Sequence, residues 1–296
     1  MSERIFVSTP NDSVLDVTQF QIKTQVLKLI KRAGFEPQEF SVSGLPAQLM
    51  WNYENVNQVL HRCQGAVILG LERWQAGPGQ GIHGLATAFN HFEGALALAH
   101  QLPTLVIAER GTERQGIFFL SAGQNTVYLL SPSMIDWHKT KTFRNKFKAW
   151  RTEVTARFQV FAGYCAQANP TAQAIIKEFK KQGVSVMDWQ KHFRPGRSIL
   201  EEVERASQTC MAGVFLFTCD DALITQNKKR AAPRDNVILE AGYFLHAKGK
   251  ERALIICEKG VKVPADLGGN IYIELEDRHD ITTIKTRLSD FIQDRL

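Results

Sequence analysis

The sequence predicts two tandem five-stranded parallel (flavodoxin-like) α/β units. Short apolar runs alternate with amphipathic helical patterns, as in parallel sheets covered by helices on both faces. This alternation stops at a basic segment after Trp137 and then starts again. The chain has 296 residues and 44% hydrophobic content, enough for two domains of ordinary size. We therefore expect an α/β domain at 1–137, a basic amphipathic connector helix at 138–156 and a second α/β domain at 157–296.

The N-terminal half begins with a predicted strand and helix. The run RIFVS at residues 4–8 is typical of a short buried strand, and residues 18–33 have the spacing of an amphipathic helix that ends before Gly34. Further strands are expected at 66–71, 103–108 and 126–130. Strands that alternate with helices in this way indicate a parallel sheet.

The segment after Trp137 is strongly basic. Residues 138–151 contain six cations, and Phe143, Phe147 and Trp150 recur at helical spacing. This pattern predicts a connector helix whose apolar stripe docks on a domain. Binding to nucleic acid or to a membrane surface is the alternative, which we consider the less common use of such a helix.

The C-terminal half repeats the strand and helix pattern. Strands are expected at 158–163, 184–187, 213–218, 253–257 and 271–273. A central helix is predicted to start at Asp235 as N-cap and to stop at Gly249. Its core stripe consists of Val237, Ala241, Phe244 and Leu245.

Glu240 stands out in this helix because its neighbours along the chain are apolar. A carboxylate in such surroundings is costly to bury unless the protein uses it, so Glu240 is a candidate functional residue. The alternative is a structural ion pair with Arg234 or Lys248.

The two halves share landmarks in the same order. They are a glycine after the first helix (Gly34, Gly183), a cysteine before the third strand (Cys63, Cys210) and a glutamate at the same distance beyond that cysteine (Glu93, Glu240). Matching order and spacing favour an internal duplication over coincidence.

Composition narrows the classes of partner and compartment. The net charge of +6 favours anionic partners, among them nucleotides, nucleic acid and membranes. Five scattered cysteines without CxxC spacing indicate neither a disulfide framework nor a zinc site. Without a signal-peptide pattern or a long apolar run, we expect a cytoplasmic protein with no membrane partner.

Polar residues follow the strand predicted at 213–218. Asp220 and Asp221 come at the carboxyl edge of the sheet, where doubly wound folds bind ligands, although turn formation and capping would also explain them. The predicted loop 222–235 then carries four cations, either as a solvated loop or as an approach for a diphosphate ligand: Lys228, Lys229, Arg230 and Arg234.

Several segments together resemble a known family. They are VSVMDWQKHFRPGRSILEEVE, GVFLFTCDD, PRDNVILEAGYFLHAKGKERALII and VPADLGGNIYIEL. In order and spacing they resemble the TIR-like (Toll-interleukin-receptor-like) nucleotide-binding domain of bacterial antiphage effectors, over residues 158–296. The resemblance implies hydrolysis of NAD at the nicotinamide ribosyl bond, with Glu240 at the position of the family's catalytic glutamate. It also implies activation by assembly into a homo-oligomer or filament, with NAD as the substrate, no cofactor and no metal.

Cleavage of the bond between nicotinamide and ribose can proceed with a single catalytic carboxylate. Cleavage of the bond to cationic nicotinamide builds an oxocarbenium-like centre, which a nearby carboxylate stabilises. Nicotinamide leaves as a neutral molecule, so no strong general acid is required. The substrate contacts we expect are stacking on Tyr164, Trp189 and Phe193, a phosphate on Arg197, and polar contacts with Asp220, Asp221, Arg234 and Asn236. Tyr164 as a cap of the sheet edge and Trp189 as a core residue are the alternatives.

The N-terminal half carries a weaker signal. Its segment FNHFEGALALAHQLPTLVI loosely resembles the glutamate helix of nucleoside deoxyribosyltransferases and of TIR-like folds, but no aspartate pair follows its third strand. The glycines at 79, 81 and 84 satisfy GxGxxG, yet a mobile loop is favoured over a dinucleotide fingerprint because Pro78 intervenes. We predict a regulatory site for a nucleotide second messenger, with a second catalytic centre as the alternative. Its residues would be Thr9, Gly79, Gly81, Gly84 and Glu93.

Two function classes follow. The first is an NAD hydrolase (NADase) that acts as a signal-activated antiviral effector, and the second is a non-catalytic nucleotide-binding adaptor that signals by self-assembly. Glu240 in an intact motif favours the enzyme. Nucleic acid is disfavoured as a partner.

Overall fold

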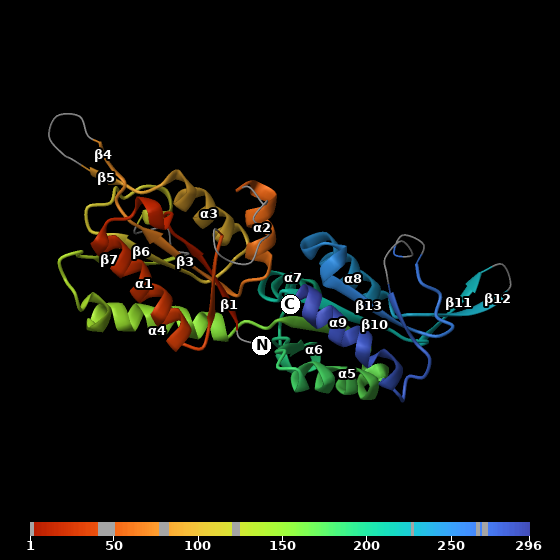
Figure 1. Ribbon diagram of the computed structural model, residues 1–296. Coiled ribbons are helices and arrows are strands. Elements are labelled where there is room, and N and C mark those ends of the chain that lie inside the picture. Colours follow the sequence, from red (N-terminus) through yellow and green to blue (C-terminus); the bar gives the residue numbers. More distant parts are fainter. Residues whose placement is uncertain are drawn as a thin grey trace. The chain divides into compact units, whose positions relative to one another are not determined.

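The computed structural model contains two five-stranded parallel sheets, one in each half of the chain (Figure 1). The structure describes residues 3–40, 51–76, 83–119, 125–225, 228–264, 267 and 272–296. The chain divides into two compact units between Ala156 and Arg157. The predicted fold class is confirmed, since each unit is a parallel α/β sheet with helices on both faces.

The sheet of the N-terminal unit has the strand order β2-β1-β3-β6-β7, and all its pairs are parallel. Its strands are β1 (Arg4–Ser8), β2 (Glu36–Glu39), β3 (Gly65–Gly70), β6 (Thr104–Glu109) and β7 (Asn125–Leu130). A separate antiparallel pair is formed by β4 (Trp74–Ala76) and β5 (His83–Leu85). The helices are α1 (Val17–Arg32), α2 (Tyr53–His61), α3 (Ala88–Ala99) and α4 (Lys141–Thr155).

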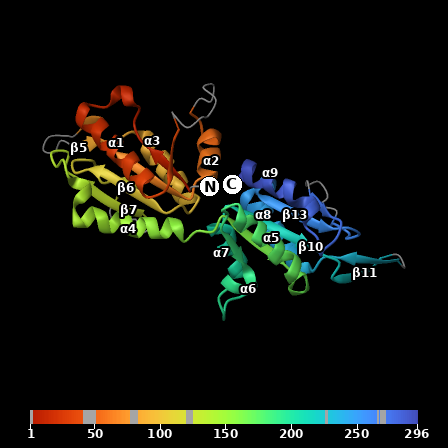
Figure 2. The same ribbon diagram turned by 60° about the horizontal axis from the view of Figure 1, so that its bottom comes forward.

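Helices α1 and α4 cover one face of this sheet, and α2 and α3 cover the other. The segment predicted as a connector contains α4, which packs along β6 and β7 within the N-terminal unit (Figure 2). Its apolar stripe is buried at Phe143, Trp150 and Val154, and the Trp150 indole N–H donates to the Pro103 carbonyl at 2.9 Å. Helix α4 is therefore part of the core of this unit.

The C-terminal unit has the order β14-β13-β10-β8-β9, again with all pairs parallel. Its strands are β8 (Val160–Tyr164), β9 (Val186–Asp188), β10 (Ala212–Phe217), β13 (Ala253–Glu258) and β14 (Tyr272–Leu275). The helices are α5 (Asn169–Lys181), α6 (Trp189–His192), α7 (Ile199–Thr209), α8 (Asp235–Lys248) and α9 (Lys285–Arg295).

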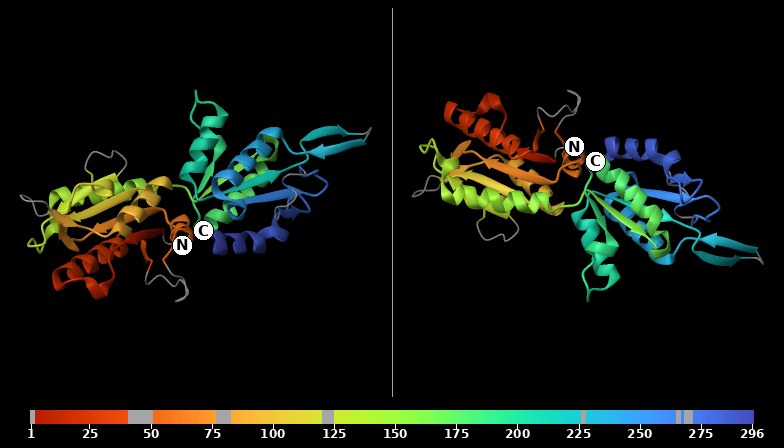
Figure 3. Two further views of the ribbon diagram at one scale, coloured as in Figure 1. Left: turned by 90° about the horizontal axis from the view of Figure 1, so that it is seen from above. Right: turned by 90° about the horizontal axis from the view of Figure 1, so that it is seen from below.

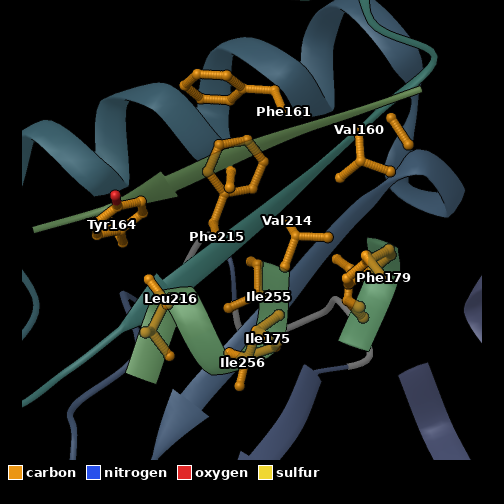
Figure 4. Close-up of a cluster of buried hydrophobic side chains, with 14 of the residues drawn as sticks. Val160, Phe161, Tyr164, Ile175, Phe179, Val214, Phe215, Leu216, Ile255 and Ile256 are labelled. Atoms are coloured by element: carbon orange, nitrogen blue, oxygen red, sulfur yellow. The ribbon is translucent and has the colours of Figure 1, made fainter. Parts of the chain in front are cut away.

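Alternation along β8 and β10 builds the two core layers of this unit. Figure 4 shows Phe161 and Phe215 on one side of the strands, with Val214 and Phe179 on the other. Phe161 and Phe215 pack on Phe244 of α8, with ring centroids 5.1 and 5.3 Å apart. The α8 face of the sheet is thus an aromatic layer, and it fixes the position of that helix.

Three local predictions were wrong. Strand β2, with the sequence EPQE, was missed because it is a polar edge strand that lacks a β-forming pattern. The predicted loop 222–235 contains most of an antiparallel hairpin formed by β11 (Asp221–Thr225) and β12 (Lys228–Ala232). This hairpin extends away from the five-stranded sheet of the C-terminal unit (Figure 3). Asp235 is the first residue of α8 and not its N-cap; Arg234 occupies the cap position without a side-chain hydrogen bond.

The landmarks of the predicted duplication occupy equivalent places. Read from the edge strand β2 or β9, both sheets have the same order of strands. Gly34 and Gly183 follow the first helix of each unit with positive φ, a conformation that suits glycine. Glu93 and Glu240 are each the sixth residue of the helix after the third strand.

The structure describes all five cysteines. Cys63, Cys165, Cys210 and Cys257 are buried thiols, and Cys219 is exposed. In the described part of the chain, no helix has both the length and the apolarity that crossing a membrane requires. The same residues contain no group of three or more His, Cys, Asp or Glu that could hold a metal ion.

Candidate active site

Glu240 lines a cavity in the C-terminal unit. Helix α8 packs on β8, β10 and β13, and only 7% of Glu240 is exposed. Its Oε2 atom is buried without a hydrogen-bond partner. Burial alone raises the pKa of Glu240 to about 8, because no charged group opposes the desolvation of the carboxylate. Within the described residues, Glu240 forms neither of the two predicted ion pairs. Arg234 pairs with Asp221 instead. The pKa of Lys248 is lowered to about 8 by burial and by the nearby charge of Arg157.

Gly163 on β8 makes room for this carboxylate. A Cβ atom at this position would lie 2.6 Å from Glu240 Oε2 and 2.6 Å from the Phe215 ring. Real Cβ atoms do not approach other atoms so closely, so a larger residue would displace Glu240 or the ring. Gly163 was not predicted as a site residue, although glycine within a strand is a known sign of close approach.

The cavity has a volume of about 510 Å³. It opens at the carboxyl ends of β8 and β9, next to the point between β8 and β10 where the strand order reverses. Doubly wound sheets bind their ligands at such a point. Residues from four segments line it: Tyr164, Cys165, Ala166 and Gln167; Trp189, Gln190 and Phe193; Arg194, Arg197, Ser198, Ile199 and Glu202; Arg234, Asn236, Val237 and Glu240.

Three aromatic side chains form one wall. The Tyr164 hydroxyl donates to Asp188 Oδ1 at 2.6 Å, and its ring centroid lies 5.8 Å from that of Trp189. Phe193 stacks on Phe161 at 5.7 Å, with 7° between the ring planes. The Trp189 indole nitrogen is buried without a partner. The wall is held in place from behind and offers apolar ring surface to a ligand.

Arginines stand around the cavity. Arg234 pairs with Asp221 at 3.0 Å, and Arg194 pairs with buried Glu202 at 2.7 Å. Arg197 lies 3.8 Å from Glu201, which together with Ser198 forms a capping box at the start of α7. Some of the N–H groups at this helix end are therefore already bonded within the protein.

Seven of the residues predicted to contact substrate or to catalyse lie around this one cavity: Tyr164, Trp189, Phe193, Arg197, Arg234, Asn236 and Glu240. Asp220 and Asp221 are not among its lining residues. Cys165 Sγ donates to Asp220 Oδ2 at 2.7 Å, and Thr218 also donates to this carboxylate. Arg194, Cys165 and Gln167 line the cavity but were not predicted, since nothing in their spacing distinguishes them from other loop residues.

Asp220 belongs to a network that joins strand ends. Besides Cys165 after β8 and Thr218 after β10, it faces Arg278 Nη2 at 3.8 Å. Arg278 in turn pairs with Glu258, the last residue of β13, and Glu258 accepts the Cys219 backbone N–H at 2.8 Å. We call these side chains the Asp220 network.

In the N-terminal unit, Glu93 is also buried, with 5% exposed. It differs in being hydrogen-bonded: the Trp51 indole N–H donates to Glu93 Oε1 at 2.8 Å, and the Ser8 hydroxyl is a second donor. Burial raises the pKa of Glu93, and these two bonds act against that rise. Thr9 directly follows Ser8 at the end of β1.

The other predicted regulatory residues lie in a different segment. Gly84 is in β5, where an added Cβ would collide with Glu72, and its N–H donates to Gly111 at 3.0 Å. Gly79 and Gly81 lie outside the described residues. A cavity of about 560 Å³ lies near Glu72 and Gly111, at the carboxyl ends of β3 and β6. Buried Glu109 lines it and accepts the Glu72 N–H at 2.6 Å.

Comparison with known proteins adds to this geometry. Residues 159–277 match the family model described as the CAP12/Pycsar effector protein, TIR domain. The C-terminal unit is a TIR-like domain. This confirms the resemblance predicted for that half, and the match does not extend to the N-terminal unit, whose looser resemblance stays a prediction.

Two curated relatives illustrate the similarity of the TIR-like unit. The Pycsar effector protein XpPycTIR from Xanthomonas perforans is 33% identical over 116 residues, covering 38% of this chain and 38% of that protein. CD-NTase-associated protein 12 from a Lachnospiraceae bacterium is 29% identical over 111 residues, covering 38% of this chain and 35% of that protein. The chain therefore spans less than half the length of either relative. The TIR domain of the Toll-related receptor TRR-2 from Hydra magnipapillata aligns with a TM-score of 0.35 and 14% identity, over 46% of this chain and 98% of that one.

Proposed function

We propose that the TIR-like unit hydrolyses the N-glycosidic bond between nicotinamide and ribose in NAD. The observation that carries this proposal is Glu240, a buried carboxyl group with an unpaired oxygen that lines a cavity with an aromatic wall. An unsatisfied buried oxygen is costly for the fold, so it calls for a ligand that uses it. Ribose hydroxyls are donors suited to this acceptor.

Each side of the cavity suits one part of NAD. The rings of Tyr164, Trp189 and Phe193 would stack on nicotinamide or adenine, and Arg197 and Arg234 would face the diphosphate. Asn236, near the start of α8, would bond a ribose or amide group. The Glu240 pKa of about 8 keeps the carboxyl group mostly protonated at neutral pH, and a cationic nicotinamide ring would favour the carboxylate.

The chemical step then needs only this carboxylate. The C–N bond between ribose and nicotinamide breaks, and its electron pair passes to the ring nitrogen, so nicotinamide leaves neutral. Glu240 stabilises the positive charge that develops on the ribose. Water adds to the ribose carbon and releases a proton to give ADP-ribose, whereas attack by an internal nucleophile would give a cyclic product.

We further propose that the chain is a cytoplasmic, signal-activated antiphage effector. Support comes from the names of its relatives, which are Pycsar effector and CD-NTase-associated proteins, consistent with a nucleotide second messenger. The N-terminal unit would bind this signal near Thr9 and Glu93, and binding would favour an assembled, active homo-oligomer or filament. The signal shifts the population only as far as its affinities for the resting and active states differ.

The direct test is nicotinamide release by the purified full-length protein. We expect low activity alone and a steep rise with protein concentration or with one member of a panel of linear and cyclic nucleotides. Liquid chromatography of the products distinguishes ADP-ribose from a cyclic form. Calorimetry of the full chain and of Glu93→Gln then measures binding of the activating nucleotide.

Contrary outcomes are equally clear. NAD that stays intact in every mixture, although the protein binds a nucleotide and assembles, would support the non-catalytic adaptor. Constant specific activity without any ligand would argue against signal activation. Unchanged binding of the nucleotide by Glu93→Gln would move the sensing site away from Glu93.

A further inference from the structure

The segment 138–151, which leads into helix α4 and forms most of it, concentrates the positive charge of the chain. Residues 138–151 contain six Lys and Arg residues and no Asp or Glu, which equals the formal net charge of the whole chain, +6. The remainder of the sequence is therefore balanced. Such a local excess of one sign produces a strong field over one part of the surface.

Four of these cations form a stripe on one side of the helix. They are Lys141, Arg144, Lys148 and Arg151, at spacings of three and four residues, and all four are exposed. None of them forms an ion pair with a described residue, whereas Lys139 pairs with Asp136 at 2.9 Å. From Lys141 to Arg151 the stripe is about 15 Å long at about 1.5 Å per residue.

A groove of about 650 Å³ runs beside this stripe. All four stripe cations line it, together with the half-buried ring of Phe147 and with Leu29 of α1. His138 and Asn145 contribute polar groups. The groove thus combines unpaired cations with apolar surface and, among its lining residues, contains no carboxylate.

The packing of α4 distinguishes between two kinds of polyanion. A basic helix binds a membrane by inserting its apolar face, but that face of α4 is occupied: Phe143, Trp150 and Val154 are buried in the unit's own core. What remains is charge spread along about 15 Å. A nucleic-acid strand presents one phosphate per about 3.4 Å, so the stripe matches about four phosphates.

We propose that the α4 groove binds the phosphate backbone of a nucleic acid without sequence preference. The sequence alone disfavoured this partner because a docked helix explains the pattern; the structure shows that docking uses the apolar side and leaves the cations unpaired. The inference is independent of NAD cleavage. Phosphate contacts position such a ligand and make its affinity depend on salt.

Fluorescence anisotropy tests this with the full-length protein and labelled duplex and single-stranded oligonucleotides from 50 to 200 mM salt. The triple variant Arg144→Gln, Lys148→Gln, Arg151→Gln should bind at least tenfold more weakly at 50 mM salt. Its slope of log affinity against log salt for the duplex should be shallower by about 2 to 3, since each phosphate contact contributes about 0.9. The matched control is Lys177→Gln, Lys180→Gln, Lys181→Gln, which removes three exposed cations from α5 and should bind as the wild type does.

Two results would overturn the proposal. Equal losses in both triple variants would mean that net charge alone attracts the oligonucleotide. Wild-type binding to vesicles with anionic lipid, but to neither oligonucleotide, would identify a lipid surface as the partner. Circular dichroism and thermal unfolding verify that both variants are folded, which is expected because every substituted side chain is exposed.

Discussion

The two units carry a glutamate at the same place in the same fold, but in opposite states. Glu93 is bonded by Trp51 and Ser8, whereas Glu240 Oε2 has no partner. The first strand explains part of the difference. Ser8 pairs with the fourth residue of β3, and Gly163 pairs with the fourth residue of β10. Where one unit has a hydroxyl donor, the other has a glycine, and the Glu240 carboxylate occupies the room that a side chain would need.

The same fold with a buried carboxyl group at the same place therefore gives the two glutamates different surroundings. In the N-terminal unit the donors are built into the chain, so the carboxyl group is satisfied without a ligand. In the TIR-like unit Glu240 Oε2 has no donor from the described part of the protein, and under the proposed function a ligand would supply one. Function depends on the few side chains around the glutamate and not on the sheet that presents them.

The largest expected difference between the two units comes from substituting each glutamate separately. Glu240→Gln should lower nicotinamide release at least about 1000-fold, because the amide cannot stabilise the positive ribose centre. Glu93→Gln should leave the activity of preassembled protein unchanged. Chromatography of the products, at equal concentrations of folded protein, measures both. If the two variants lost activity equally, the units would share one catalytic function and the comparison would fail.

The second largest effect concerns pH and stability. The Glu240 pKa of about 8 in the folded protein lies above its ordinary value of 4.5, so the folded state holds the proton more tightly. This contribution to stability is complete below about pH 4.5 and is lost as the pH rises through about 8. The free energy of unfolding of Glu240→Gln, relative to that of the wild type, should therefore rise by on the order of 1 to 4 kcal/mol from pH 5 to pH 9. Urea unfolding at both pH values tests this, and a difference that does not change with pH would contradict it.

A third test adds a methyl group at Gly163, where it would collide with Glu240 and Phe215. Gly163→Ala places a Cβ 2.6 Å from Oε2, so we expect a loss of about 1 to 3 kcal/mol of stability and a further fall in activity. Gly242→Ala is the matched control on α8, where an added Cβ meets nothing within 4 Å; it should stabilise the helix by about 0.5 to 1 kcal/mol. Thermal unfolding of the two variants should give opposite signs. Equal changes would show that the strand tolerates a larger residue there.

The smallest expected effect concerns the hydrogen bond from Trp51 to Glu93 in the N-terminal unit. Trp51→Phe removes the indole donor to Glu93 and should cost about 1 to 2 kcal/mol, because a buried carboxyl oxygen loses its partner. In a Glu93→Gln background the cost should be smaller. A double-mutant cycle from urea unfolding measures the coupling. Additive changes would mean that the bond contributes nothing to stability.

Much of the fold could be predicted from the sequence because its central strands are continuous apolar runs. Residues 4–8 match β1 in full, and the runs at 103–108 and 213–218 lie within one residue of β6 and β10. Strand β2 lacks this signal because it is polar and pairs with β1, about thirty residues earlier in the chain. The β11–β12 hairpin pairs locally, but the cations of β12 are also typical of a solvated loop.

The candidate site was predictable where one residue is locally unusual. Glu240 was found because a carboxylate is rare among apolar neighbours in a helix. The surroundings of Glu240 could not be predicted, because they include Gly163, which lies more than seventy residues earlier in the chain. The same holds for Asp220, whose partners Cys165 and Arg278 come together only in the folded sheet.

The Asp220 network has a thermodynamic consequence for ligand binding. It links the ends of β8, β10 and β13 through side chains of Cys165, Thr218 and Glu258 with Arg278. The rim next to the cavity is therefore ordered by the protein's own bonds before any ligand arrives. Ordering a mobile rim would oppose association by about 0.5 to 1.5 kcal/mol for each side chain immobilised. With that entropy loss already incurred during folding, more of the contact energy with a bound nucleotide remains as affinity.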